Sequence, residues 1–98
     1  MSKIATRLAK KAYRKLRQHY QAILSTKCGK LKMMAGKKYK IKYHECMIEK
    51  LKAKYELKKV YIETCTTVQC KEKYTKKLKL YLVMIDKHKK MIQMYMSR

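Results

Sequence analysis

The sequence predicts an all-α fold in which a basic N-terminal helix and a short linker precede one long helix or a helical hairpin. Apolar residues recur at helical spacing over residues 1–24 and again, close to a heptad repeat, over residues 57–96. The 98-residue chain contains no Pro, no Asn and only two Gly, so it offers few tight turns. We therefore expect few, long elements in a single small domain, residues 1–98.

The first helix is expected over residues 1–24, with two sides of opposite character. Its apolar side is formed by Ala5, Leu8, Ala12, Leu16, His19 and Ile23. Six cations lie within an arc of about 120° on the other side, namely Lys3, Arg7, Lys10, Lys11, Arg14 and Arg17. Because the apolar side is narrow and rich in Ala, we expect this helix to dock closely on a neighbour and to leave its cations outside.

Residues 25–37 are expected to form a linker, and residues 38–98 a helical C-terminal part. Both glycines fall within the linker. A competing prediction is an α+β fold with strands near residues 60–68 and 78–85, because the first segment is rich in β-branched residues. Helix is favoured because a strand meander would need turn residues that the segment lacks, and because the apolar positions form a near-heptad seam. This seam consists of Leu57, Tyr61, Thr64, Val68, Thr75, Leu78, Leu82, Ile85, Ile92 and Met96.

The charge of the chain points to a polyanionic partner. Twenty-eight Lys and Arg stand against six Asp and Glu, which gives a net charge of +22, and the first acidic residue is Glu45. A small soluble domain usually carries a net charge of about 2–8. With 47% apolar residues the chain is too hydrophobic for a disordered basic tail, so we expect a partner that neutralises the charge to order it. The longest uncharged stretches, such as residues 80–85, are too short for a transmembrane segment.

Two basic segments are the candidate RNA-binding sites. The cations of the first helix, with Tyr13 and Tyr20 near their border, suit phosphates and unpaired bases. Lys37, Lys38 and Lys40 are interleaved with aromatic residues and suit an RNA backbone in the same way. Two other interpretations stay open: a solvated charged surface and, for the first helix, a mitochondrial targeting element.

The remaining chemistry-bearing residues favour neither a metal site nor catalysis. The cysteines, Cys28, Cys46, Cys65 and Cys70, lack the short C-x2-C spacing of structural zinc sites. We expect them to be small buried thiols in a reducing compartment. The six acids are dispersed, and the sequence has no Gly-rich phosphate loop and no Ser/His/Asp grouping. The prediction is a protein that is not an enzyme and that has no metal, cofactor or small-molecule substrate.

The opening residues 1–14 resemble the start of the eukaryotic small-subunit ribosomal protein seventeen family. The likeness rests on Thr6, the Lys10-Lys11-Ala12 run and Arg14, and further on Tyr20 and Leu24. Residues 33–38 are similar to the second basic motif of that family, after a shorter intervening segment and without its proline. The resemblance covers less than half of the chain, and it implies that the opening segment is a basic helix lying on ribosomal RNA.

Composition and resemblance together predict a structural ribosomal protein. It would bind rRNA through the basic helix and the linker, while the C-terminal part packs on rRNA or on neighbouring ribosomal proteins. Its ribosome is either cytoplasmic or mitochondrial. The alternative is a peripheral basic subunit of a membrane-bound complex, whose helix lies on anionic lipid.

Overall fold

The computed structural model describes residues 3–97, and it describes side chains from residue 7 onward. Three long helices and one short helix follow one another: α1 (Lys3–Ser25), α2 (Gly29–Lys32), α3 (Lys37–Ile62) and α4 (Val68–Met96). No strand occurs among the described residues. The predicted all-α fold is confirmed, and the C-terminal part is a helical hairpin of α3 and α4. The strands considered near residues 60–68 and 78–85 are not formed.

The β-branched segment around residues 60–68 contains the turn of the hairpin, which spans residues 63–67 between α3 and α4. β-Branched side chains lose rotamer freedom in a helix, so the run favours an interruption. Thr67 has extended backbone and its hydroxyl accepts a hydrogen bond of 3.1 Å from the backbone N–H of Cys70, which caps the first turn of α4. A disulfide between Cys65 and Cys70 closes the same turn.

The linker has structure of its own, because α2 lies inside it. The residue before α3 is Gly36, with a φ of 110°, a conformation that side chains rarely adopt. This glycine lets the chain reverse direction between α2 and α3. Helix α3 therefore begins at Lys37, one residue earlier than the predicted start of the C-terminal part.

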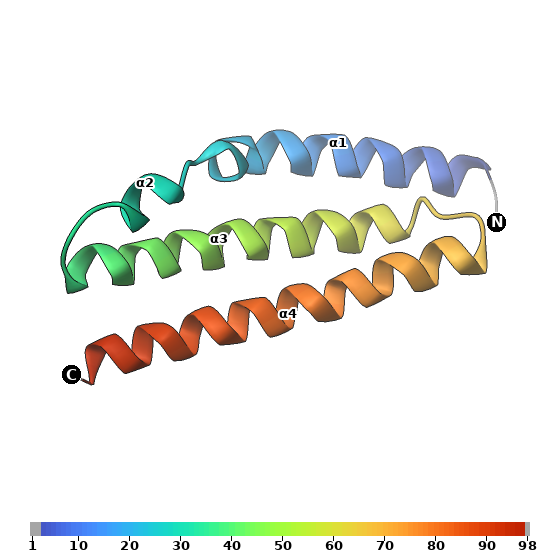
Figure 1. Cartoon of the computed structure of the whole chain (residues 1–98). Coiled ribbons are helices and arrows are strands. Elements are labelled where there is room, and N and C mark those ends of the chain that lie inside the picture. Colours follow the sequence, from blue (N-terminus) through green and yellow to red (C-terminus); the bar gives the residue numbers. More distant parts are fainter. Residues whose placement is uncertain (1–2, 98) are drawn as a thin grey trace.

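The three long helices lie side by side as one layer, with α3 in the middle (Figure 1). Helix α1 packs on one edge of α3 and α4 on the other, and α1 and α4 make no close backbone contact within the described range. The molecule measures 54 × 24 × 17 Å. Its radius of gyration is 16.5 Å, whereas a compact chain of this length has about 13 Å. The molecule is therefore elongated along the helix axes, and α3 has two sides that neither α1 nor α4 covers.

The main core lies between α3 and α4. Ile48, Leu51 and Ile85 are buried there. Tyr81, Met84 and Ile92 pack around them. The predicted heptad seam is right at Ile85 and Ile92. It is wrong at Val68, Thr75, Leu82 and Met96, which are exposed, because α4 meets α3 through the side that carries Tyr81, Met84 and Ile85.

Helix α1 docks on α3 through a different side from the one predicted. Ala9 is buried and Leu16 is half-buried, but Leu8 is 63% exposed, and Ala12 and His19 are also exposed. The contact is rotated toward Tyr13 and its neighbours, because the large tyrosine rings bury more surface than Ala12 or His19 would. The predicted role of Ala5 lies outside the described side chains.

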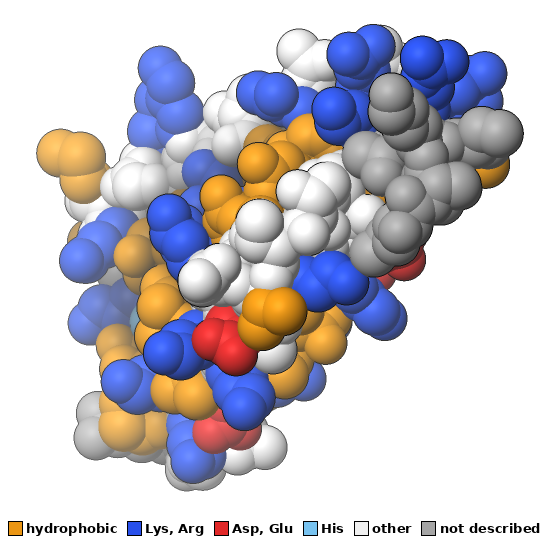
Figure 2. Space-filling view, turned by 90° about the vertical axis from the view of Figure 1, so that its right-hand side faces the viewer, with side chains coloured by type: hydrophobic (Ala, Val, Ile, Leu, Met, Phe, Trp, Pro, Cys, Tyr) orange, Lys and Arg blue, Asp and Glu red, His pale blue; other side chains and the backbone are white. Residues whose placement is uncertain are grey.

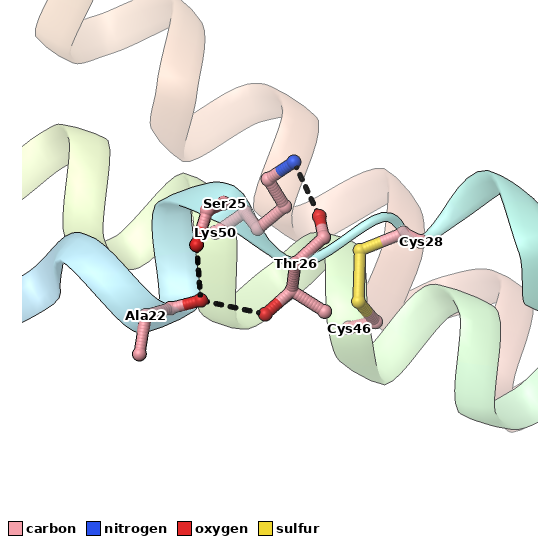
Figure 3. The surroundings of a disulfide bond; sticks show 6 residues. All are labelled: Ala22, Ser25, Thr26, Cys28, Cys46 and Lys50. Atoms are coloured by element: carbon pink, nitrogen blue, oxygen red, sulfur yellow. Dashed lines mark hydrogen bonds between the residues drawn. A yellow bond between two sulfur atoms is a disulfide. The ribbon is translucent and has the colours of Figure 1, made fainter.

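The end of α1 is fastened to α3 (Figure 3). The hydroxyls of Ser25 and Thr26 both donate to the carbonyl oxygen of Ala22, at 3.1 and 2.9 Å. Lys50 Nζ from α3 donates to the carbonyl oxygen of Thr26 at 2.8 Å. Two residues later, Cys28 is bonded to Cys46 of α3. The expectation of four buried thiols is therefore wrong: the cysteines form two disulfides, each across a turn or linker that sequence spacing does not reveal.

The layer leaves much of the chain exposed. The accessible surface is 7617 Å², compared with about 5900 Å² for an average folded monomer of this mass. Within the described part of the chain, no helix is long and apolar enough to cross a bilayer. The chain therefore exposes more surface than an average folded monomer of its mass.

Candidate nucleic-acid interface

The two faces of the layer, on the two uncovered sides of α3, differ in charge. One of them, here called the carboxylate face, has a groove of about 680 Å³ between α1 and α4. Apolar side chains of Tyr20, Ile23 and Leu82 line this groove, and its charged side chains are of both signs: Glu49, Glu56, Lys52 and Lys89. Acidic and apolar side chains therefore share this face.

All six acidic residues lie away from the other face. Glu45 and Glu63 continue the stripe of Glu49 and Glu56, because the spacings of 4, 7 and 7 residues return to the same side of a helix. On α4, Glu72 and Asp86 lie on the side of Leu82, about 140–180° from Tyr81 around the helix axis. Tyr81 belongs to the opposite face, so that face has no carboxylate among the described residues.

This opposite face, here called the tyrosine face, is crossed by a chain of aromatic rings. The ring centroids of Tyr13 in α1 and Tyr61 in α3 are 5.5 Å apart, in an edge-to-face arrangement. Those of Tyr61 and Tyr74 in α4 are 4.8 Å apart, also edge-to-face. A hydrogen bond with Tyr74 raises the pKa of the Tyr61 hydroxyl. The rings thus connect all three helices across the layer.

Three cations surround the ring of Tyr74, and within the described range none of them is paired with a carboxylate. Lys58 Nζ lies 4.7 Å from the ring centroid, and Lys73 and Lys77 lie at 5.6 and 5.5 Å from the same ring. Burial, together with the charges of Lys77 and Lys73, lowers the pKa of Lys58. The three ammonium groups repel one another, and a bound anion would relieve that repulsion.

Two adjoining pockets open on the tyrosine face. The first has a volume of about 370 Å³ and is lined by Lys10, Tyr13, Arg14, Arg17, Tyr61 and Thr64. The second has about 320 Å³ and is lined by Tyr13, Arg17, Leu24, Lys54, Leu57, Lys58 and Tyr81. They share Tyr13 and Arg17, so they form one continuous depression from α1 toward α4. Its charged side chains are all cationic.

Most of the predicted site residues on α1 belong to this region. Lys10, Arg14 and Arg17 line the pockets, and Arg7 and Lys11 are exposed farther along the outer side of α1. Figure 2 views the layer from the end where α1 begins, and Lys and Arg side chains crowd the upper rim, over α1. The side chain of Lys3 lies outside the described residues.

Two parts of the predicted site do not join this region. Tyr20 lines the groove of the carboxylate face and neither pocket of the tyrosine face, so the structure does not bring it into the same pocket as Tyr13. Lys37, Lys38 and Lys40 are exposed at the start of α3. They are separated from Tyr61 by about 30 Å of helix, as 21 residues at 1.5 Å each separate Lys40 from Tyr61. The Lys40 ammonium lies over the ring of Tyr95 instead, at 5.7 Å.

Sequence reasoning misses Lys54, Lys58, Tyr61, Tyr74 and Tyr81 as parts of this surface. It places Tyr61 in a hydrophobic seam and gives the others no role. A local signal is present, since Lys58 precedes Tyr61 by three residues and Lys77 follows Tyr74 by three, which places each cation beside a ring. Their meeting across two helices depends on the position of the hairpin turn.

A second polar cluster lies at the other end of the hairpin. His44 Nδ1 and His88 Nδ1 are 2.8 Å apart, and the His44 ring stacks on Tyr95. Among the described residues, no three His, Cys, Asp or Glu side chains come together in a way that could hold a metal ion. The two imidazoles therefore act as a hydrogen-bonded pair.

Comparison of the chain with models of protein families, with curated proteins and with solved structures finds no match.

Proposed function

We propose that the protein is a structural RNA-binding component of a ribonucleoprotein particle, with ribosomal RNA as its partner. The observation that carries this proposal is the tyrosine face, where cations and aromatic rings lie together and the pocket walls contain no carboxylate. RNA recognition uses these two groups: cations for phosphates, and ring faces for bases.

The RNA phosphates would neutralise the positive charges of the chain, and this neutralisation would order its helices. Each cation that contacts a phosphate releases condensed counterions, which favours binding. The same contacts remove the repulsion among like charges in a chain of net charge +22, so they stabilise the layer of helices. Neighbouring proteins of the particle would cover apolar side chains that the layer leaves exposed, such as Leu80 and Val83 on α4.

The disulfides bear on the location of the particle. Disulfides persist in oxidising compartments and are rare in the cytosol. The pairs Cys28–Cys46 and Cys65–Cys70 therefore argue against the expected reducing compartment, and against a cytoplasmic ribosome in particular. RNA binding by the tyrosine face does not depend on this point.

The proposal is tested by salt titration of RNA binding. Replacing Arg7, Lys10, Arg14 and Arg17 with Gln should flatten the slope of log K against log salt concentration by about 0.7–0.9 for each phosphate that is no longer neutralised. A control variant removes four cations from other surfaces, Lys52, Lys59, Lys79 and Lys89, and should change the slope less. Equal slopes for the two variants would reject the cationic side of α1 as the RNA surface.

An anionic membrane surface is the second candidate, and one observation favours it. Met33 is 89% exposed and Met34 is 48% exposed in the connection between α2 and α3, directly after Lys30 and Lys32. Apolar side chains beside cations suit a lipid interface. Co-sedimentation with vesicles that contain anionic lipid tests it: binding that disappears in Met33→Ser with Met34→Ser, and that RNA does not displace, would favour lipid.

A further inference from the structure

We propose that the pocket between α1 and α3 binds an unpaired nucleotide of a single-stranded RNA segment, with the base against Tyr13 and Tyr61 and the phosphate on Lys10 and Arg14. This proposal rests on the proposed function and assigns the part of the RNA that the tyrosine face recognises. It makes the tyrosine face selective for single strands over duplexes.

The size and chemistry of the pocket fit a nucleotide. Its volume of about 370 Å³ lies in the range of small-ligand sites, about 300–1,000 Å³. Two half-buried rings, Tyr13 and Tyr61, form part of the wall, and the cations of α1 form another part. The adjoining pocket, with Lys58 and Tyr81, extends the path toward α4 and has room for the next nucleotide. A base and its phosphate therefore find matching groups side by side.

The charge distribution selects this face over the opposite one. The groove on the carboxylate face is larger, about 680 Å³, and also contains aromatic rings. However, Glu49 and Glu56 in that groove offset the charges of Lys52 and Lys89 in the same wall, so the groove offers a phosphate no net positive charge. The pockets of the tyrosine face have no carboxylate in their walls, and three lysines already lie close together around the ring of Tyr74 on the same face.

Ring contact separates single strands from duplexes. In an A-form helix the bases are stacked on one another, and proteins contact mainly phosphates and 2′-hydroxyls. Rings that lie in a pocket are useful only for a base that has left the stack. A surface of lysines alone would bind duplex and single strand by charge, whereas this pocket adds a contribution that only an unpaired base can give.

The test compares a 12-nucleotide oligouridylate with a 12-base-pair RNA duplex, using the full chain with its disulfides intact. In Tyr13→Leu and Tyr61→Leu, the affinity for the single strand should fall about 5- to 150-fold for each base that no longer stacks. The affinity of these variants for the duplex should stay within a factor of two of that of the unaltered protein. Their slope of log K against log salt concentration should also stay the same, because no cation is removed. Tyr13→Phe keeps the ring and should restore single-strand binding.

The matched control is Tyr20→Leu, in the same helix but on the carboxylate face. It should bind both RNAs like the unaltered protein. An equal loss of affinity in Tyr20→Leu, or an equal loss on the duplex, would overturn the nucleotide pocket while leaving RNA binding intact. If the unaltered protein binds neither RNA but binds anionic vesicles, the proposed function itself fails.

A second measurement does not require the variants to fold. Photo-crosslinking of the unaltered protein to an oligonucleotide containing 4-thiouridine, followed by mass spectrometry, should place crosslinks on Tyr13 or Tyr61. Crosslinks confined to the start of α3, at Tyr39 or Tyr43, would overturn the proposal and move the base contacts to the other end of the layer.

Discussion

The hydrogen-bonded pair of His44 and His88 ties α3 to α4 near the C-terminal end of the hairpin. A bond between two Nδ1 atoms requires that one imidazole donates and the other accepts, so at least one ring must be neutral. Burial, then the charge of His88 and that of Lys32, lower the pKa of His44, and burial lowers the pKa of His88. The neighbouring rings of Tyr43 and Tyr95 supply no negative charge to offset a second proton.

This pair predicts a dependence of stability on pH. Because both folded pKa values lie below the unfolded value of 6.5, the unfolded chain binds more protons in that range. The free energy of unfolding should therefore be highest above about pH 6.5 and should fall as the pH is lowered below it. Thermal melts between pH 8 and 5 measure the effect.

The variant His88→Gln should flatten that pH profile, since it removes one titrating group and the repulsion of the doubly protonated pair. His19→Gln, which removes an exposed imidazole outside the pair, is the control and should keep the fall in stability that His88→Gln loses. An unaltered pH profile in His88→Gln would contradict the role of the pair.

At the scale of elements, few buried contacts and crosslinks hold α1 on the rest of the molecule. Ala9 is its only buried side chain among those described, and the disulfide of Cys28 with Cys46 holds the far end. The crosslink closes a loop with a sequence separation of 18, which contributes about 3 kcal/mol on the chain-entropy account. Helix α1 is therefore the element that should be released first.

Replacing both Cys28 and Cys46 with Ser should lower the free energy of unfolding by about 3 kcal/mol and speed amide exchange throughout α1. The comparison is the double Ser variant of Cys65 and Cys70, whose separation is only 5. It should lose about 2 kcal/mol, with faster exchange around the hairpin turn instead. Identical exchange patterns in the two variants would show that the first disulfide does not hold α1.

The α3–α4 core gives a second prediction for an element. Leu51 is 2% exposed, so Leu51→Ala should cost about 2–5 kcal/mol and loosen the whole hairpin. Leu80→Ala, at a position that is 55% exposed on α4, should cost less than about 1 kcal/mol. Chemical denaturation followed by circular dichroism measures both. Similar losses at the two positions would mean that α4 packs in another register.

The sequence allows the helices to be predicted, but it does not reveal which side of each helix contacts its neighbour. The helical spacing in residues 3–24 and the scarcity of turn residues follow from the chain itself, and so does the side of α1 that carries Arg14 and Arg17. The hairpin turn at residues 63–67 cannot be located from the sequence, because β-branched residues favour strands and helix ends alike. That turn decides which side of α4 meets α3, and with it the meeting of Tyr61 and Tyr74. The disulfides are missed for the same reason, since Cα–Cα distances of 5.8 and 5.6 Å arise only once the chain is folded.

At the scale of the whole molecule, the small core and the net charge of +22 make stability depend on ions. The repulsion extends over about 10 Å at 0.1 M salt and about 3 Å at 1 M. The melting temperature should therefore rise with NaCl concentration. Inorganic polyphosphate at 100 times its dissociation constant should add about 2.7 kcal/mol at constant ionic strength, or roughly 10–20 °C. A melting temperature that responds to neither would contradict the account of neutralisation and ordering.

The sorting of carboxylates onto one face also affects how the molecule arrives at its partner. Because the carboxylates lie on one side of the layer and uncompensated cations on the other, the centre of charge does not coincide with the centre of mass. In the field of a polyanion such a molecule experiences a torque, and it turns the tyrosine face forward before any contact forms. A larger share of the collisions with the polyanion then brings the tyrosine face into contact. Replacing Glu49 and Glu56 with Lys would strengthen the overall attraction to the polyanion. It would also weaken the preference for binding through the tyrosine face.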